Sequence, residues 1–96
     1  MHEQSKIYQN IKDGKLDTAL KDLFENIEEN PAIVENYINA GIVLSDVGEI
    51  EKAERFFQKA LTIEPENGAV YYNLANIYYN EERYNEAIKL YQTALQ

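Results

Sequence analysis

The chain has 96 residues and no cysteine, so it is the size of one small domain, and disulfides and thiolate metal sites are excluded. Nine basic against seventeen acidic residues give a net charge of −8. This charge disfavours nucleic acids and anionic membrane surfaces as partners, because both are bound mainly through lysine and arginine. It favours neutral or basic partners, and acidity that serves only solubility is the alternative.

The start of the chain is polar and lacks the apolar segment of a secretory signal. No apolar run approaches the roughly 20 residues that span a bilayer. Together with the lack of cysteine, which fits a reducing compartment, these features lead us to expect a cytoplasmic protein.

Apolar residues recur at three- and four-residue spacings along the chain, which predicts amphipathic helices. In chain order, we expect helices near residues 4–13, 16–29, 34–47, 50–63, 68–80 and 83–96. Gly48 interrupts the pattern between two of them, and Pro65 stops the next. Asn67 is expected to cap the helix that follows it. The pattern therefore predicts an all-α chain of paired helices.

The same residue types return at one fixed interval along the sequence. Pro31 and Pro65 are one interval apart, as are Gly14 and Gly48. Two apolar rows follow the same interval: Ala19, Ala53 and Ala87, and Leu23, Phe57 and Tyr91. A fixed period of about 34 residues predicts an α-solenoid of stacked helical hairpins, a class of protein that presents an extended surface to partners.

These residues resemble the tetratricopeptide repeat. Residues 34–67 match it at Tyr37, Ala40, Gly41, Leu44, Ala53, Phe57, Ala60 and Pro65, and residues 68–96 match it at Tyr71, Leu74, Ala75, Tyr78, Ala87, Tyr91 and Ala94. A degenerate first repeat, about residues 1–33, keeps Gly14 and Ala19 but has Asn26 where the others have alanine. The resemblance implies a single domain over residues 1–96, a right-handed superhelical array of three repeats (about 1–33, 34–67 and 68–96). It also implies protein–protein interaction as the function.

In similar domains, the first helices of successive repeats line a concave groove that holds an extended peptide. The corresponding positions here include Tyr8, Asn39, Ile42, Asp46, Tyr72, Asn73, Asn76, Tyr79 and Asn80. We expect Asn39 and Asn73, one repeat apart, to be exposed, because their amides can then pair with a peptide backbone of any sequence. The tyrosines would add apolar contact with a polar tip. The alternative is a solvated polar face in an asparagine-rich protein.

The best-known ligand of such grooves is the C-terminal carboxylate tail of the major heat-shock chaperones, held by a clamp of Lys, Asn and Arg. Asn39 matches one clamp asparagine. The other clamp positions hold Gln4, Tyr8, Ala69 and Asn73, so the required cations are missing. An acidic tail would lack its charge-assisted hydrogen bonds here. We therefore expect an extended neutral or basic peptide of another protein as the ligand.

Catalysis, cofactors and metals are not expected. His2 is the only histidine, and without a cysteine or a second histidine there is no plausible pair of nucleophile and base.

The chain ends within the last expected helix, where Ile88 and Leu95 would lie on an uncovered face. Repeat arrays normally cover such a face. One alternative function is therefore a structural domain that self-assembles through this helix, as a homodimer, with Ile88 and Leu95 in the contact. The other is an accessory N-terminal part of a longer repeat protein.

Overall fold

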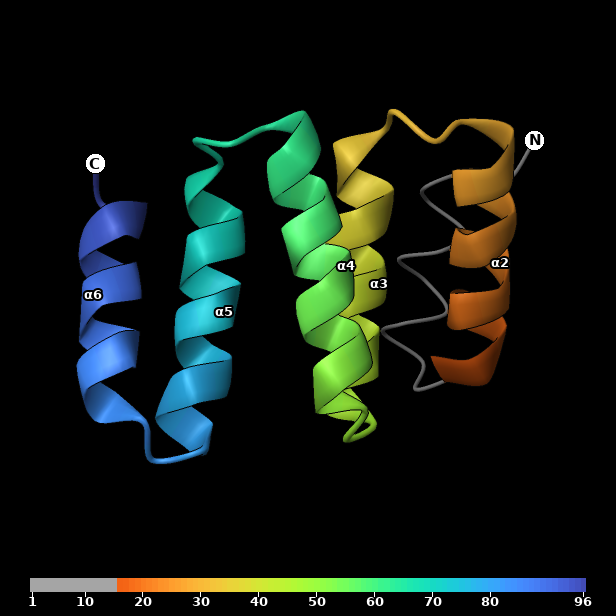
Figure 1. Cartoon of the computed structure of the whole chain (residues 1–96). Coiled ribbons are helices and arrows are strands. Elements are labelled where there is room, and N and C mark those ends of the chain that lie inside the picture. Colours follow the sequence, from red (N-terminus) through yellow and green to blue (C-terminus); the bar gives the residue numbers. More distant parts are fainter. Residues whose placement is uncertain (1–15) are drawn as a thin grey trace.

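The computed structural model of the chain describes residues 16–96, and over this range it is an α-solenoid without strands (Figure 1). The helices, in chain order, are α2 (Leu16–Glu29), α3 (Val34–Asp46), α4 (Ile50–Ile63), α5 (Gly68–Asn80) and α6 (Tyr84–Ala94). Each helix packs against the next along the chain, and α5 also contacts α3. The predicted all-α solenoid is confirmed.

The predicted helix boundaries agree closely with these elements. The ranges 16–29, 50–63 and 68–80 are those of α2, α4 and α5, whereas α3 ends one residue early and α6 is shorter at both ends. The helix expected at 4–13 lies outside the described residues. Asn67 caps α5 as predicted, because its side-chain oxygen accepts a hydrogen bond from the Val70 amide at 3.3 Å.

Two helical hairpins, α3–α4 and α5–α6, close with the same backbone turn. The Glu49 amide donates to the Leu44 carbonyl, and the Arg83 amide donates to the Tyr78 carbonyl, both at 2.8 Å. The residue before each donor is left-handed: Gly48 has φ 87° in the first turn, and Glu82, one repeat later, has φ 63°. Glycine adopts this conformation freely, but a glutamate is strained there by about 1–2 kcal/mol. The second turn therefore carries a backbone strain at Glu82 that the first turn, with Gly48, does not have.

A tyrosine near the start of each first helix fastens that helix to the preceding loop. The Tyr37 hydroxyl donates to the Pro31 carbonyl at 2.6 Å, and the Tyr71 hydroxyl donates to the Pro65 carbonyl at 2.7 Å. These bonds satisfy loop carbonyls that the helices leave unpaired. The same bond thus recurs one repeat apart, between a tyrosine and the proline six residues before it.

The core runs along the inside of the helix row, where α3, α4 and α5 meet. Its buried members are Val34, Tyr37, Leu44, Ala53, Phe57, Ala60, Val70, Leu74 and Ile77. Phe57 lies directly against the backbone of α3 at Gly41. A Cβ atom at Gly41 would lie 2.6 Å from a Phe57 ring carbon, closer than real carbon atoms approach. Glycine at this position is thus what allows α3 and α4 to pack so closely.

Gly41→Ala is expected to destabilise the protein by about 1 kcal/mol. Alanine gains about 1 kcal/mol of helix propensity over glycine, but overpacking a buried ring costs about 1–3 kcal/mol. Phe57 is 1% exposed and belongs to the core cluster, so its ring cannot shift without disturbing its neighbours. Urea denaturation of the two proteins measures the difference.

The matched control is the same change in a Phe57→Leu background. Leucine lacks the ring atoms nearest to Gly41, so Gly41→Ala should there be neutral or stabilising. An equal loss of stability in both backgrounds would contradict the proposed contact.

Candidate functional site

A groove lies between α3 and α5, where the sequence predicted a peptide site. It encloses a recess of about 280 Å³. Its lining comes from Ile42, Ser45 and Asp46 of α3, Phe57 of α4, and Asn73, Asn76, Ile77 and Asn80 of α5. We call this set the α3/α5 groove. It brings together five of the predicted groove residues, Ile42, Asp46, Asn73, Asn76 and Asn80.

The groove forms because α5 presents three asparagines on one side. Asn73, Asn76 and Asn80 follow the three- and four-residue spacing of a single helix face. Leu74 and Ile77 lie on the buried side of the same helix, so packing of the core turns the asparagines toward α3. The buried apolar residues of α5 therefore determine the direction in which its three asparagines face.

Two of these asparagines already make hydrogen bonds within the protein. The Asn73 amide nitrogen donates to the Ala69 carbonyl, one turn back on α5, at 2.8 Å. The Asn76 carbonyl oxygen accepts a hydrogen bond from the Tyr91 hydroxyl of α6. Each bond uses one end of the amide and holds the side chain in place, and the other end can serve a ligand. Asn80 is exposed near the C-terminal end of α5.

The prediction that Asn39 is exposed is wrong. Only 8% of this residue is accessible, and its side chain interacts within the protein. The reason is the position of α3, which is packed against α2, α4 and α5 at once. Most of α3 is consequently buried. Asn39 therefore has a different environment from Asn73, which lies one repeat later and is partly exposed. The expected pairing of Asn39 with Asn73 as an exposed ladder is therefore not formed.

The predicted groove tyrosines lie on the side of α5 that faces α6. The Tyr72 ring packs against Tyr91 with centroids 5.7 Å apart, and the Tyr79 ring packs edge-on against Tyr84 at 5.3 Å. Tyr72 and Tyr79 are both more than half exposed. They form an aromatic border to the asparagine row and do not line the recess itself. Tyr8 lies outside the described residues.

Ser45, Phe57 and Ile77 line the groove but were not predicted as groove residues. A signal for Ser45 exists, because it is one repeat before Tyr79 and three residues after Ile42. Ile77 is mostly buried and was not separable from the core residues by its spacing. The two predicted self-association residues are far from the groove. Ile88 is 53% exposed and Leu95 is 89% exposed, both at the α6 end of the helix row.

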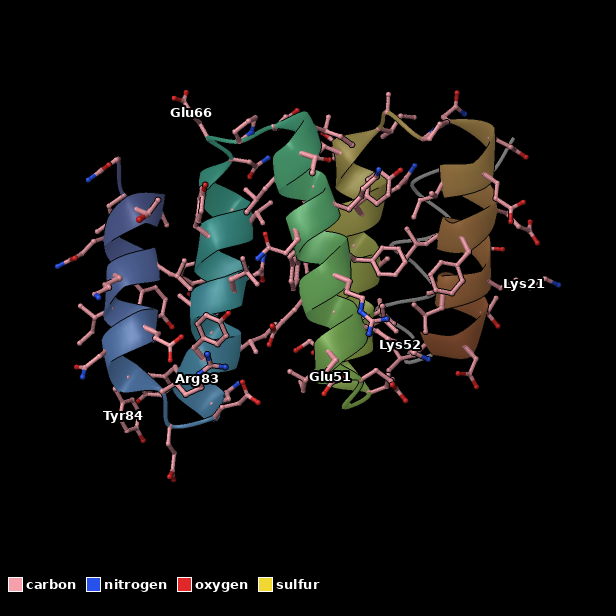
Figure 2. The ribbon with its side chains drawn as sticks, in the orientation of Figure 1. Lys21, Glu51, Lys52, Glu66, Arg83 and Tyr84 are labelled. Atoms are coloured by element: carbon pink, nitrogen blue, oxygen red, sulfur yellow. The ribbon has the colours of Figure 1, made fainter. Side chains whose placement is uncertain are left out.

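An acidic recess of about 560 Å³ lies between the turns of the two hairpins. Gly48, Glu49, Ile50, Glu51, Glu54, Glu81 and Arg83 line it. Figure 2 shows Glu51 and Arg83 at this end of the molecule. The Arg83 guanidinium donates to both Glu86 carboxylate oxygens at 2.9 and 2.6 Å and lies 4.1 Å from the Tyr78 ring centre. Contacts with Glu86 and Tyr78 thus hold the Arg83 side chain in place.

Glu54 is a partly buried carboxyl of this recess. Partial burial raises its pKa above the usual 4.5, and repulsion from Glu81 raises it further, while Arg83 opposes the shift. In contrast, the hydrogen bonds from Arg83 lower the pKa of Glu86. Ionisation of Glu54 is therefore less favourable in the folded protein than in the unfolded chain.

Among residues 16–96 there is no group of three or more His, Cys, Asp or Glu side chains placed to hold a metal ion. Within the same range, every helix is too short or too polar to cross a membrane.

Comparison with known proteins identifies the repeat. A sequence model described as the tetratricopeptide repeat matches residues 44–96, more than half of the chain. A search among curated proteins finds no match.

Solved structures share the fold over nearly the whole chain. A crystal structure of MamA is 25% identical, with a TM-score of 0.84, over 93% of this chain and 52% of that one. A MamA structure from MSR-1 is 25% identical, with a TM-score of 0.81, over 92% and 51%. The chain thus spans about half the length of these MamA structures. The second tetratricopeptide domain of Spaghetti (RPAP3), bound to the HSP90 peptide SRMEEVD, is 17% identical, with a TM-score of 0.85, over 96% and 85%.

Glu54→Gln is expected to stabilise the protein at neutral pH by about 0.5 kcal/mol, the scale of changes at partly exposed sites. Because the folded state raises the pKa of Glu54, it binds the proton more tightly than the unfolded state. Stability attributable to Glu54 therefore falls as pH rises from 4.5 through the raised pKa. The stabilisation by Glu54→Gln should reach its full size at pH values above the raised pKa of Glu54. It should be absent below about pH 4, where Glu54 is protonated in both the folded and the unfolded state.

Urea denaturation of both proteins across this pH range measures the effect. Glu28→Gln, on the exposed side of α2, is the matched control for the loss of one negative charge. A gain from Glu54→Gln that is the same in acid as at neutral pH would contradict the assignment.

Proposed function

The chain belongs to the tetratricopeptide repeat family, and from this premise we propose that it binds an extended peptide segment of a partner protein in the α3/α5 groove. The single observation that carries the proposal is the convergence of Asn73, Asn76 and Asn80 on one recess. A domain of the same fold, from Spaghetti, was solved with a peptide bound, which supports peptide binding as a use of this architecture.

The asparagines suit a peptide backbone better than a particular side chain. With its nitrogen bonded to Ala69, Asn73 offers its carbonyl oxygen to a peptide N–H. With its oxygen bonded to Tyr91, Asn76 offers its amide nitrogen to a peptide carbonyl. An extended peptide carries both groups in alternation, so donors and acceptors on one helix face can bind it in register. Ile42 and Tyr72 would contact its side chains.

Charge favours a neutral or basic peptide. Among residues 16–96, Asp46 is the one charged residue in the lining of the groove, and the protein carries a net charge of −8. An acidic ligand such as SRMEEVD would be repelled by Asp46, and the lining that residues 16–96 provide offers it no lysine or arginine. A lysine or arginine of the ligand near Asp46 would instead be attracted.

The domain organisation remains part of the proposal. We propose that the hairpins α3–α4 and α5–α6 belong to repeats 34–67 and 68–96, that α2 belongs to a first repeat of about 1–33, and that the three repeats form one domain. The function so proposed is binding and not catalysis. A cytoplasmic location stays a prediction from the sequence.

The groove is tested by a peptide-display selection on the purified chain, with counter-selection against an Asn73→Ala, Asn80→Ala variant. Each neutral hydrogen bond contributes about 1 kcal/mol, so loss of two should weaken a selected peptide by about 30-fold. Fluorescence anisotropy with a labelled selected peptide measures the change. Selected peptides should be neutral or basic, and SRMEEVD should bind more weakly than they do.

The matched control is Asn30→Ala with Asn85→Ala, which removes two exposed asparagines outside the groove. It should bind selected peptides at full strength. Thermal unfolding of both variants should stay close to that of the unchanged chain, because none of the four residues is buried. Equal affinity of all three proteins for the selected peptides would overturn the groove as the site.

A further inference from the structure

One hydrogen bond links the α3/α5 groove to α6. The part of the groove that residues 16–96 provide is lined by α3, α4 and α5. Asn76 is one of the lining residues of α5, and its side-chain oxygen accepts a hydrogen bond from the Tyr91 hydroxyl of α6. Figure 1 shows α6 beside α5, on the side away from α3 and α4. The bond therefore connects a groove side chain to a helix outside the groove.

The bonded pair replaces an apolar pair that lies one repeat earlier. Ile42 stands at the position of Asn76, and Phe57 stands at the position of Tyr91. Both of these earlier residues also line the groove. Because phenylalanine occupies the same position in α4, packing of a helical hairpin does not require the Tyr91 hydroxyl. The hydroxyl occurs where its neighbour is an amide, which makes Asn76 its reason for being there.

The Tyr91 ring is held in a defined position. Its side chain is partly buried, and the Tyr72 ring packs against it with centroids 5.7 Å apart and planes inclined at 60°. Tilted aromatic pairs of this kind stabilise one arrangement of the two rings. A tyrosine side chain has only two torsion angles, so fixing the ring also fixes the hydroxyl oxygen. Tyr91 therefore offers Asn76 a bonding partner at a constant place.

The bond decides which end of the Asn76 amide faces a ligand. An asparagine without such a partner can present either its accepting oxygen or its donating nitrogen. In Asn76 the oxygen is bonded to Tyr91, so turning that oxygen toward a ligand would break the bond. One neutral hydrogen bond favours the bonded orientation by about fivefold. Asn76 consequently presents its nitrogen as a donor.

We propose that Tyr91 is a positioning residue that sets the specificity of the groove. By holding the oxygen of Asn76, it makes this position select a hydrogen-bond acceptor, a backbone carbonyl, and reject a donor. The inference rests on the proposed function and adds the group that the bound segment presents at Asn76. Since the nitrogen of Asn73 is bonded to the Ala69 carbonyl, α5 then carries an acceptor followed by a donor in fixed order.

The positioning is tested first without a ligand. In the ¹⁵N-labelled chain, the heteronuclear NOE of the Asn76 side-chain amide measures its fast motion. Tyr91→Phe should lower this NOE, because the amide loses its partner. Tyr84→Phe removes the hydroxyl of an exposed tyrosine of the same helix and should leave the NOE unchanged. Circular dichroism checks that both variants fold. An Asn76 amide that is equally ordered in all three proteins would overturn the proposal.

The selectivity is tested with a display-selected peptide and a series in which one backbone amide at a time is a thioamide. Sulfur is a weaker acceptor than oxygen, whereas the N–H of a thioamide is a stronger donor. The thioamide that reports on Asn76 is the one whose effect disappears in Asn76→Ala. Anisotropy should show it binding about fivefold more weakly than the amide to the unchanged chain and to Tyr84→Phe. With Tyr91→Phe the loss should fall to about twofold.

Two binding results would overturn this inference alone. One is a thioamide effect that depends on Asn76 but keeps its full size with Tyr91→Phe. The other is a thioamide that binds the unchanged chain more tightly at this linkage, because Asn76 would then present its oxygen to the peptide N–H. Failure of the proposed function gives a different result, since selected peptides would bind Asn76→Ala and the Asn73→Ala, Asn80→Ala variant at full strength. That result would overturn both proposals.

Discussion

The contact between Phe57 and the backbone at Gly41 determines the geometry of the described chain. It brings α4 against α3 at a distance that only glycine permits, and the ring then forms part of the surface on which α5 packs. A solenoid has few contacts between distant parts of the sequence, so each interface fixes the next. The position of α5, and of everything on it, depends on this ring.

The groove and its aromatic border are two consequences of the same stacking. On one side of α5, packing on α4 leaves Asn73, Asn76 and Asn80 facing α3 across a recess. On the other side, Tyr72 and Tyr79 meet tyrosines of α6. The Tyr91–Asn76 hydrogen bond joins the two sides, because it orients a groove amide from the helix behind it. A ligand in the groove therefore meets an asparagine whose orientation α6 sets.

The fold could be predicted from the sequence because its determinants repeat locally. One interval separates the recurring small residues, aromatics, prolines and turn glycines. Each of these residues predicts a local feature, such as a helix, a helix crossing or a turn, that does not depend on residues far away in the sequence. The same periodicity misled the prediction for Asn39. Residues one repeat apart share a backbone position but not neighbours, and α3 has eight buried residues where α5 has four.

The detail of the site depends on side-chain conformations that a spacing does not encode. Asn73 donates a hydrogen bond to a carbonyl of its own helix, and Asn76 accepts one from α6. Which partner each side chain has depends on its rotamer in the packed structure. Asn26 gives another example. It stands at the position of Ala60 and Ala94, is 4% exposed, and its amide nitrogen has no hydrogen-bond partner in the part of the chain that the structure describes. The substitution is visible in the sequence, whereas its unsatisfied burial is visible only in the structure.

We propose that a peptide binds along the asparagine row of the α3/α5 groove. The most direct measurement is the NMR spectrum of the side-chain amide groups of Asn73, Asn76 and Asn80 as a display-selected peptide is added to the ¹⁵N-labelled chain. We expect these signals to shift together and to saturate with the affinity measured by anisotropy. Unchanged asparagine signals at saturation, with shifts confined to backbone amides elsewhere, would contradict it.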